Sequence, residues 1–169
     1  THALVLDRLI EAGAKVVGFD LLFDTPSSYG RDDDATFAAS LRRHAGQVVL
    51  GVQALSSQGP IAGLSLLDLT PDLKDAHPSI KRGLLNGRPD PDGVQRRLPG
   101  STSVEFGQKL GQAVPPGMAS ALLNDKPLPV KAGLSLLAPY GPPRTIPNLS
   151  IWELPVSYTH LRAHETESN

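Results

Sequence analysis

The chain has 169 residues, of which 16 are basic and 17 acidic, and its formal net charge is -1. This length suits one domain with a single hydrophobic core, and the balanced, interspersed charge argues against a polyanionic partner such as nucleic acid. The sequence contains no cysteine, which excludes disulfides and thiolate chemistry, and it has no run of about 18 apolar residues of the kind that spans a membrane.

The first predicted elements are a helix over residues 2 to 12 and a strand over residues 15 to 20. Apolar residues recur at helical spacing in the first segment, and Gly13 is placed to end the helix. The second segment is rich in β-forming residues and ends at Asp20. Because the chain opens inside a helical pattern and not with methionine, we expect an N-terminal truncation, with a further strand of the sheet before Thr1.

A second helix and strand follow a loop rich in Pro, Gly and Ser. Three consecutive aspartates at residues 32 to 34 are predicted to cap a helix over residues 34 to 45, where their charge also suits the positive end of the helix dipole. Residues 47 to 54 form the next predicted strand. This alternation is typical of βαβ units. The sequence therefore predicts an α/β fold with a mixed, mainly parallel sheet flanked by helices, in a single domain.

The second half of the chain is punctuated by Gly and Pro. An apolar run followed by a Pro-Asp-Gly turn predicts a β-hairpin within residues 82 to 100, with Asp92 in its turn and Val94 to Leu98 as the return strand. The other predicted elements are a strand at 64 to 69, a short helix at 71 to 76, a helix at 102 to 113, a strand at 128 to 140, and a turn that begins at Ser150 and carries Trp152.

Asp20 and Asp24 are the first candidates for chemistry, because Asp20 is the last residue of a predicted strand and Asp24 is the next acid in the loop after it. Phosphatases of the haloacid dehalogenase type place a nucleophilic aspartate and an acid two residues apart, whereas these two are four apart. The spacing therefore disfavours that mechanism. A metal-dependent α/β hydrolase or phosphatase that uses Asp20 remains as an alternative function.

Other catalytic and metal-binding motifs are incomplete. Ser65 and Ser135 follow a glycine but lack the second glycine of a hydrolase elbow, and the sequence Asp-Pro-Asp-Gly at residues 90 to 93 lacks the further oxygen ligands of a calcium loop. No glycine-rich phosphate loop follows a strand, and the histidines lack ligand spacing. We therefore predict no catalytic residue, no metal site and no cofactor.

Several short motifs occur together in a definite order. They are Ala-Gly-Ala at residues 12 to 14, Phe-Asp at 19 to 20, Phe-x-x-Pro at 23 to 26, an acidic helix start at 32 to 34, and Asp-Gly-Val-x-Arg at 92 to 96. In this combination the chain resembles the second class of CHASE domain, the extracytoplasmic sensory module of bacterial receptors. The segment at 138 to 154, with its Tyr-Gly-Pro sequence, is also similar to the family.

The resemblance covers residues 1 to 155, which we predict to be the sensory domain. Residues 156 to 169 are polar and aperiodic and resemble translated sequencing-adaptor sequence, so we predict a non-native or disordered tail.

The resemblance implies a periplasmic or extracellular domain at the bacterial inner membrane, anchored through flanking helices outside this chain. Cytoplasmic outputs of such receptors include adenylate or guanylate cyclase, histidine kinase, Ser/Thr kinase and diguanylate cyclase. The domain itself is then not an enzyme. Its implied partners are an unidentified small-molecule or environmental stimulus and the membrane, with a homodimer as a further arrangement.

The candidate contact region is the loop edge where the first strand ends. Asp20 and Asp24 lie there, with the acid cluster at residues 32 to 34 as a further candidate. Asp92 and Arg96 from the hairpin are candidates either for ligand contacts or for structural ion pairs. A structural pairing of Arg96 with one of these acids is the favoured interpretation. Three hypotheses remain: a stimulus-binding sensor, the hydrolase that uses Asp20, and a dimerisation module that needs no ligand.

Overall fold

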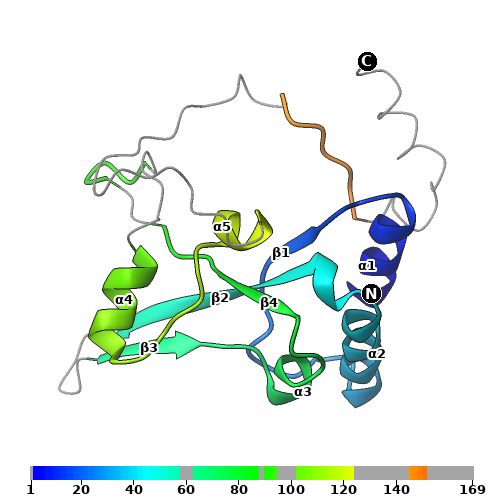
Figure 1. Ribbon diagram of the computed structural model, residues 1–169, viewed down its shortest axis with the longest axis horizontal. Helices are drawn as coiled ribbons and strands as arrows, with labels where there is room; N and C mark the ends of the chain where they lie inside the picture. Colours follow the sequence, from blue (N-terminus) through cyan, green and yellow to red (C-terminus); the bar gives the residue numbers. More distant parts are fainter. Residues whose placement is uncertain (1, 58–62, 88–89, 95–101, 124–144, 152–169) are drawn as a thin grey trace.

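The computed structural model describes residues 2–57, 63–87, 90–94, 102–123 and 145–151 (Figure 1). In chain order the elements are α1 (His2–Glu11), β1 (Val17–Leu22), α2 (Arg31–Arg43), the 3-10 helix η1 (Ala45–Gln47), β2 (Val48–Ser57), β3 (Gly63–Leu67), α3 (Pro71–Lys74), β4 (Lys81–Leu84), α4 (Thr102–Leu110) and α5 (Met118–Leu122). The predicted strand at 128 to 140, Trp152 and the tail at 156 to 169 lie outside the described residues.

Strand β2 is the centre of a four-stranded sheet. Its first half lies between β1 and β4 and pairs with both in parallel, and its second half pairs antiparallel with β3. A helix connects β1 to β2, as a parallel pair requires. The predicted α/β class, with a mixed, mainly parallel sheet flanked by helices, is confirmed.

A side chain extends the sheet beyond the end of β4. The Leu85 N–H donates to the Val52 carbonyl at 2.8 Å. One residue further on, the Asn86 amide bonds both backbone groups of Ala54: Oδ1 accepts from the Ala54 N–H at 2.6 Å, and Nδ2 donates to its carbonyl at 2.8 Å. Asn86 thus replaces a strand residue and satisfies backbone groups that are largely shielded from water.

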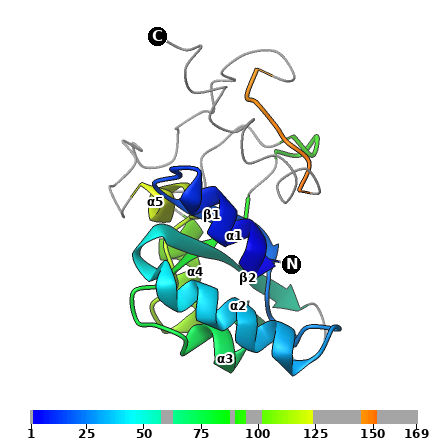
Figure 2. The same cartoon turned by 90° about the vertical axis from the view of Figure 1, so that its right-hand side faces the viewer.

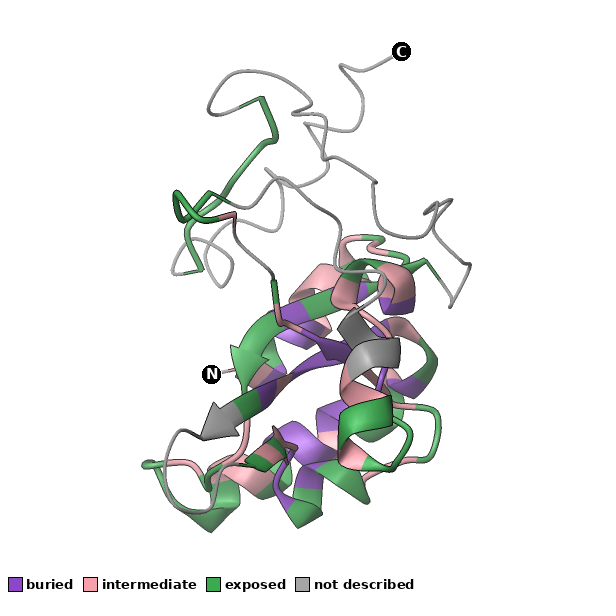
Figure 3. Ribbon diagram, turned by 90° about the vertical axis from the view of Figure 1, so that its left-hand side faces the viewer, coloured by how far each residue is buried: buried purple, intermediate pink, exposed green. Residues whose placement is uncertain are grey.

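One face of the sheet packs against α1 and α2, which lie next to each other (Figure 2). These helices contribute Leu6 and Leu41 to the same buried cluster as the alternate β2 residues Val48, Leu50 and Val52. Figure 3 shows the buried residues gathered on the strands and on the inner sides of the helices. The core therefore follows the period-two alternation of β2 and the apolar stripes of the two helices.

The opposite face is covered by the short helix α5, and glycines permit its close approach. A Cβ added at Gly83 of β4 would lie 2.7 Å from Met118 Cα, and one at Gly18 of β1 would lie 2.9 Å from Leu122 Cδ2. Real Cβ atoms essentially never come within 3.0 Å of another heavy atom in this way. At Gly83 the close atom belongs to the backbone of α5, so the helix can lie this near to β4 only because that position lacks a side chain. At Gly18 the close atom is the end of the Leu122 side chain, which can move.

The first helix was predicted correctly, and the start of the second was not. Helix α1 ends at Glu11, and Gly13 has a φ of 102°, in the left-handed region that favours glycine after a helix. Helix α2 begins at Arg31 instead of residue 34. Its N-cap residue is Gly30, with no side-chain cap, so the prediction that the aspartates cap this helix was wrong. They lie inside its first turn, where they still suit the helix dipole.

The described residues test only the first half of the hairpin predicted within residues 82 to 100. Its first strand is β4, which pairs in parallel with β2 and buries Leu84. The turn itself is formed, with the Asp90 N–H donating to the Val94 carbonyl at 3.0 Å. The predicted return strand after Val94 lies outside the described residues.

Candidate functional site

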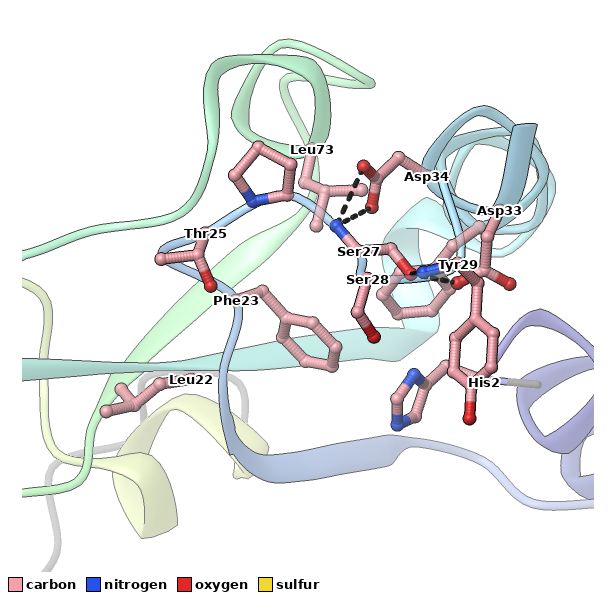
Figure 4. Close-up of a pocket in the computed structure, with 12 residues that line it drawn as sticks. His2, Leu22, Phe23, Thr25, Ser27, Ser28, Tyr29, Asp33, Asp34 and Leu73 are labelled. Atoms are coloured by element: carbon pink, nitrogen blue, oxygen red, sulfur yellow. Dashed lines mark hydrogen bonds between the residues drawn. The ribbon is translucent and has the colours of Figure 1, made fainter. Parts of the chain in front are cut away.

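A pocket opens at the carboxyl end of β1, where the chain passes into the loop before α2 (Figure 4). Its volume is about 230 Å³, somewhat below the range of roughly 300 Å³ and more that is typical of drug-sized sites, so it suits a ligand of few heavy atoms. Its walls come from α1, the loop, α2 and α3, and they include His2, Phe23, Ser27, Tyr29, Asp33 and Phe37.

Three rings of the lining, those of His2, Phe23 and Phe37, pack against one another and against Phe19, which does not itself line the pocket. The rings of Phe19, Phe23 and Phe37 lie with centroids between 5.1 and 5.9 Å apart, and the His2 ring lies 5.3 Å from Phe23. Such pairs add about 0.5–1.5 kcal/mol beyond the burial of their surface. The four rings come from α1, β1, the loop and α2, so this aromatic cluster fixes the positions of the pocket walls relative to one another.

The loop that rims the pocket is held in shape by two aspartates of the acid cluster. Both carboxylate oxygens of Asp34 accept from the Ser27 backbone N–H, at 3.0 and 3.1 Å, and Asp33 accepts from the Ser27 hydroxyl at 2.7 Å. Figure 4 shows the Asp34 carboxylate turned toward the Ser27 nitrogen. The aspartates therefore stabilise the preceding loop as well as the helix, a role that the sequence did not reveal.

Two carboxylates, those of Asp33 and Asp34, belong to the lining of the pocket. The hydrogen bond from Ser27 lowers the pKa of Asp33, against a weaker opposing effect of burial. Burial lowers the pKa of His2, while the charge of Asp33 acts in the opposite direction. None of the lining residues, all of which belong to the described part of the chain, is Lys or Arg.

The predicted site residues are dispersed. Asp20 is exposed on β1 and Asp24 is half-buried just after it, yet neither lines the pocket. Asp92 is exposed in its turn, where its carboxylate accepts from the Val94 N–H at 3.1 Å. Arg96 lies outside the described residues, so its pairing with an acid stays a prediction. Of the acids predicted at this edge, the pocket includes only members of the cluster at residues 32 to 34.

The described residues provide no group of three or more His, Cys, Asp or Glu side chains that could hold a metal ion. The alternative of a metal-dependent hydrolase using Asp20 therefore gains no support from this part of the chain.

A polar contact between α1 and α2 was missed at the sequence level. Asp7 accepts from the buried Ser40 hydroxyl at 2.6 Å and from Arg43 at 2.7 Å, and His44 Nε2 lies 3.0 Å from the same carboxylate. Residues 40, 43 and 44 share one face of a helix. Their polar side chains on that face could therefore have indicated a hydrogen-bonding partner on a neighbouring element.

Replacing Asp7 with asparagine is expected to destabilise the protein by about 1–3 kcal/mol at pH 7. Partial burial would raise the pKa of Asp7, but the hydrogen bonds from Ser40, Arg43 and His44 hold it below its ordinary value. A lowered folded-state pKa means that this stabilisation is complete above the unfolded pKa of about 3.9 and is lost as pH falls through the folded pKa. Urea unfolding of both proteins between pH 7 and pH 3 measures the difference.

The matched control is Asp72→Asn, which removes an exposed carboxylate in the first turn of α3. This change is expected to alter stability by less than about 0.5 kcal/mol. If the difference in free energy of unfolding between wild type and Asp7→Asn stayed constant from pH 7 to pH 3, the role assigned to Asp7 would be wrong.

In the described part of the chain, the helices are too short and too polar for any of them to cross a lipid bilayer.

A protein-family model described as the CHASE2 domain matches residues 1–162. No curated protein and no solved structure matches the chain. The family match contains every described element, and it reaches beyond residue 155, the end of the predicted domain. That boundary stays a prediction.

Proposed function

This chain belongs to the CHASE2 family of extracytoplasmic sensory domains of signalling receptors, and we propose that the pocket at the end of β1 receives its stimulus, a small molecule. The observation that carries this proposal is that three separate segments, α1, the β1–α2 loop and α2, each contribute an aromatic side chain to the lining of one cavity. A concave, largely apolar site with a few fixed polar groups is typical of small-molecule recognition.

The position of the pocket offers a route from binding to signalling. His2 belongs to α1 and Phe37 to α2, so a ligand in the pocket touches two helices that Asp7 also links. A ligand shifts a conformational equilibrium only by its unequal affinity for the two states. We propose that two arrangements of α1 against α2 differ in the shape of this pocket, and that the stimulus binds one of them better.

The remaining parts of the proposal concern the parent receptor. The domain would lie on the periplasmic or extracellular face of the bacterial inner membrane, held there by flanking helices beyond this chain. Its occupancy would control a cytoplasmic cyclase, histidine kinase, Ser/Thr kinase or diguanylate cyclase. The domain would act as a homodimer, in which a rearrangement of α1 against α2 would change the relative position of two output modules.

A thermal-shift screen of small polar and aromatic compounds tests the stimulus site. A compound that binds the folded state raises the melting temperature in a saturable way, corresponding to about 2.7 kcal/mol at a hundredfold excess over Kd. Ser28 is exposed and lines the pocket. Ser28→Trp is therefore expected to fill the entrance and abolish the shift without unfolding the protein.

The control is Ser79→Trp, the same change at an exposed serine that does not line the pocket, and it should leave the shift intact. If both variants lost the rise in melting temperature equally, or if saturable binding persisted in Ser28→Trp, the stimulus would not bind in this pocket. If no small molecule stabilises the domain, the dimerisation module without a ligand becomes the better hypothesis.

A further inference from the structure

We propose that Asn86 is a site of covalent modification, at which the side-chain amide converts to a carboxylate by deamidation whenever its contact with β2 opens. The folded sheet holds this reaction back, and the product weakens the sheet. The inference does not depend on the proposed stimulus site. Two features carry it: the sequence Asn86-Gly87, and the pairing of the Asn86 amide with the backbone of Ala54.

The sequence makes Asn86 reactive. Asn86 and Gly87 form the only Asn-Gly pair in the chain. In such a pair the backbone nitrogen of the glycine can attack the side-chain carbonyl carbon of the asparagine, because glycine has no Cβ that would hinder the approach. Gly87 is exposed, so solvent base reaches its N–H and can activate the nitrogen.

The reaction needs water as its co-reactant and nothing else. A bond forms between the Gly87 nitrogen and Asn86 Cγ, the bond from Cγ to Nδ2 breaks, and Nδ2 leaves as ammonia together with the proton of the Gly87 N–H. Water then opens the resulting cyclic imide. Opening at Cγ gives an aspartate, and opening at the backbone carbonyl carbon gives an isoaspartate, whose main chain is longer by one carbon.

The folded sheet holds the Asn86 amide away from this attack. Oδ1 accepts from the Ala54 N–H at 2.6 Å, and Nδ2 donates to the Ala54 carbonyl at 2.8 Å. Both bonds must break before Cγ can turn toward the Gly87 nitrogen. The Leu85 N–H donates to the Val52 carbonyl at 2.8 Å and fixes the backbone just before the site. The rate of deamidation should therefore follow the fraction of molecules in which this contact is open.

Deamidation removes a donor that the sheet uses. A carboxylate has no N–H to give to the Ala54 carbonyl, and it brings a negative charge next to that oxygen. Ala54 is buried, so water cannot replace the lost bond unless the sheet opens, and a buried carbonyl without a donor is costly. The product therefore weakens the same contact that protects the amide.

The test follows deamidation by mass spectrometry after incubation in mildly alkaline buffer, with the protein either folded or unfolded in guanidinium chloride. We expect Asn86 to react at least about tenfold faster in the unfolded chain. Asn148 is exposed and precedes Leu149, so it serves as the internal control. It should react more slowly than Asn86 in the unfolded chain, and folding should change its rate by less than about twofold.

Matched variants test the consequence and the chemistry. Asn86→Asp introduces the product side chain and should lower the urea midpoint of unfolding by about 0.5–1 M. Asn148→Asp makes the same change at an exposed position and should leave the midpoint unchanged. Gly87→Ala should slow deamidation of Asn86 in the unfolded chain, because the added Cβ hinders the attacking nitrogen.

Three results would each overturn the inference. They are equal rates for Asn86 in the folded and unfolded protein, a rate in the unfolded chain no higher than that of Asn148, and an Asn86→Asp midpoint equal to that of wild type. Should Asn86→Asp not fold, the comparison of rates on the unchanged protein decides.

Discussion

Replacing Phe37 with alanine is expected to lower the free energy of unfolding by about 3–5 kcal/mol. Phe37 is 4% exposed, and its ring centroid lies 5.6 Å from that of Phe19 and 5.1 Å from that of Phe23. Alanine would remove the ring that joins α2 to β1 and to the loop, and the rigid elements around it can close the resulting cavity only in part. Urea unfolding followed by circular dichroism measures the loss.

Two further variants show whether burial is the cause. Tyr29→Ala removes an aromatic ring of similar size that is 86% exposed, and it should change stability by less than about 0.5 kcal/mol. Phe37→Leu keeps most of the apolar volume and should lie between alanine and wild type. A loss below about 1 kcal/mol for Phe37→Ala would mean that the aromatic cluster is not part of the stable core.

Gly51→Ala is expected to destabilise the protein by about 1–3 kcal/mol, because a methyl group has no room there. A Cβ at Gly51 would lie 2.6 Å from the Leu21 carbonyl oxygen and 2.6 Å from Leu85 Cδ1. The leucine side chain can move, but the backbone oxygen of β1 cannot move without disturbing its pairing with β2. Thermal and urea unfolding should both report the loss.

The matched control is Gly46→Ala, at an exposed glycine in η1 with no heavy atom within 4 Å of an added Cβ. It should be neutral or slightly stabilising, since alanine restricts the unfolded chain. Gly83, which pairs with Gly51 across β2 and β4, faces Met118. Gly83→Ala should therefore displace α5 as well. If Gly51→Ala and Gly46→Ala changed the free energy of unfolding by the same amount, the strands could separate without loss of stability and the prediction would be wrong.

The stability of the fold and the proposed binding site depend on the same aromatic residues. Phe23 and Phe37 are both walls of the pocket and members of the cluster that joins α2 to the sheet. A ligand in the pocket would therefore stabilise the packing of α2, and a mutation that loosens this packing would weaken ligand binding. This coupling is what a sensory domain needs, because it links occupancy of a site to the arrangement of helices.

The sequence predicted those elements whose signals are local. The apolar spacing of α1, the β-forming run of β1 and the position of Gly13 each depend on residues within a few positions of one another. The helix and the glycine were predicted correctly, and the strand was found but placed at 15 to 20, whereas β1 is Val17–Leu22 and contains Asp20 before its end. The start of α2 was misplaced by three residues, because Gly30 and the aspartates of the first turn all resemble helix starts and only the backbone angle of Gly30 distinguishes them.

The sequence by itself determined the α/β class, the order of the first elements and the membership of a sensory family, because short-range periodicity and the order of motifs are properties of the chain. The tertiary structure alone decided the parallel position of β4 and the contact of Asp7 with residues of α2. It also decided which of the acids line the pocket. Each of these depends on which distant residues meet when apolar surface is buried, and that choice follows from the packing of the whole domain and not from any one segment.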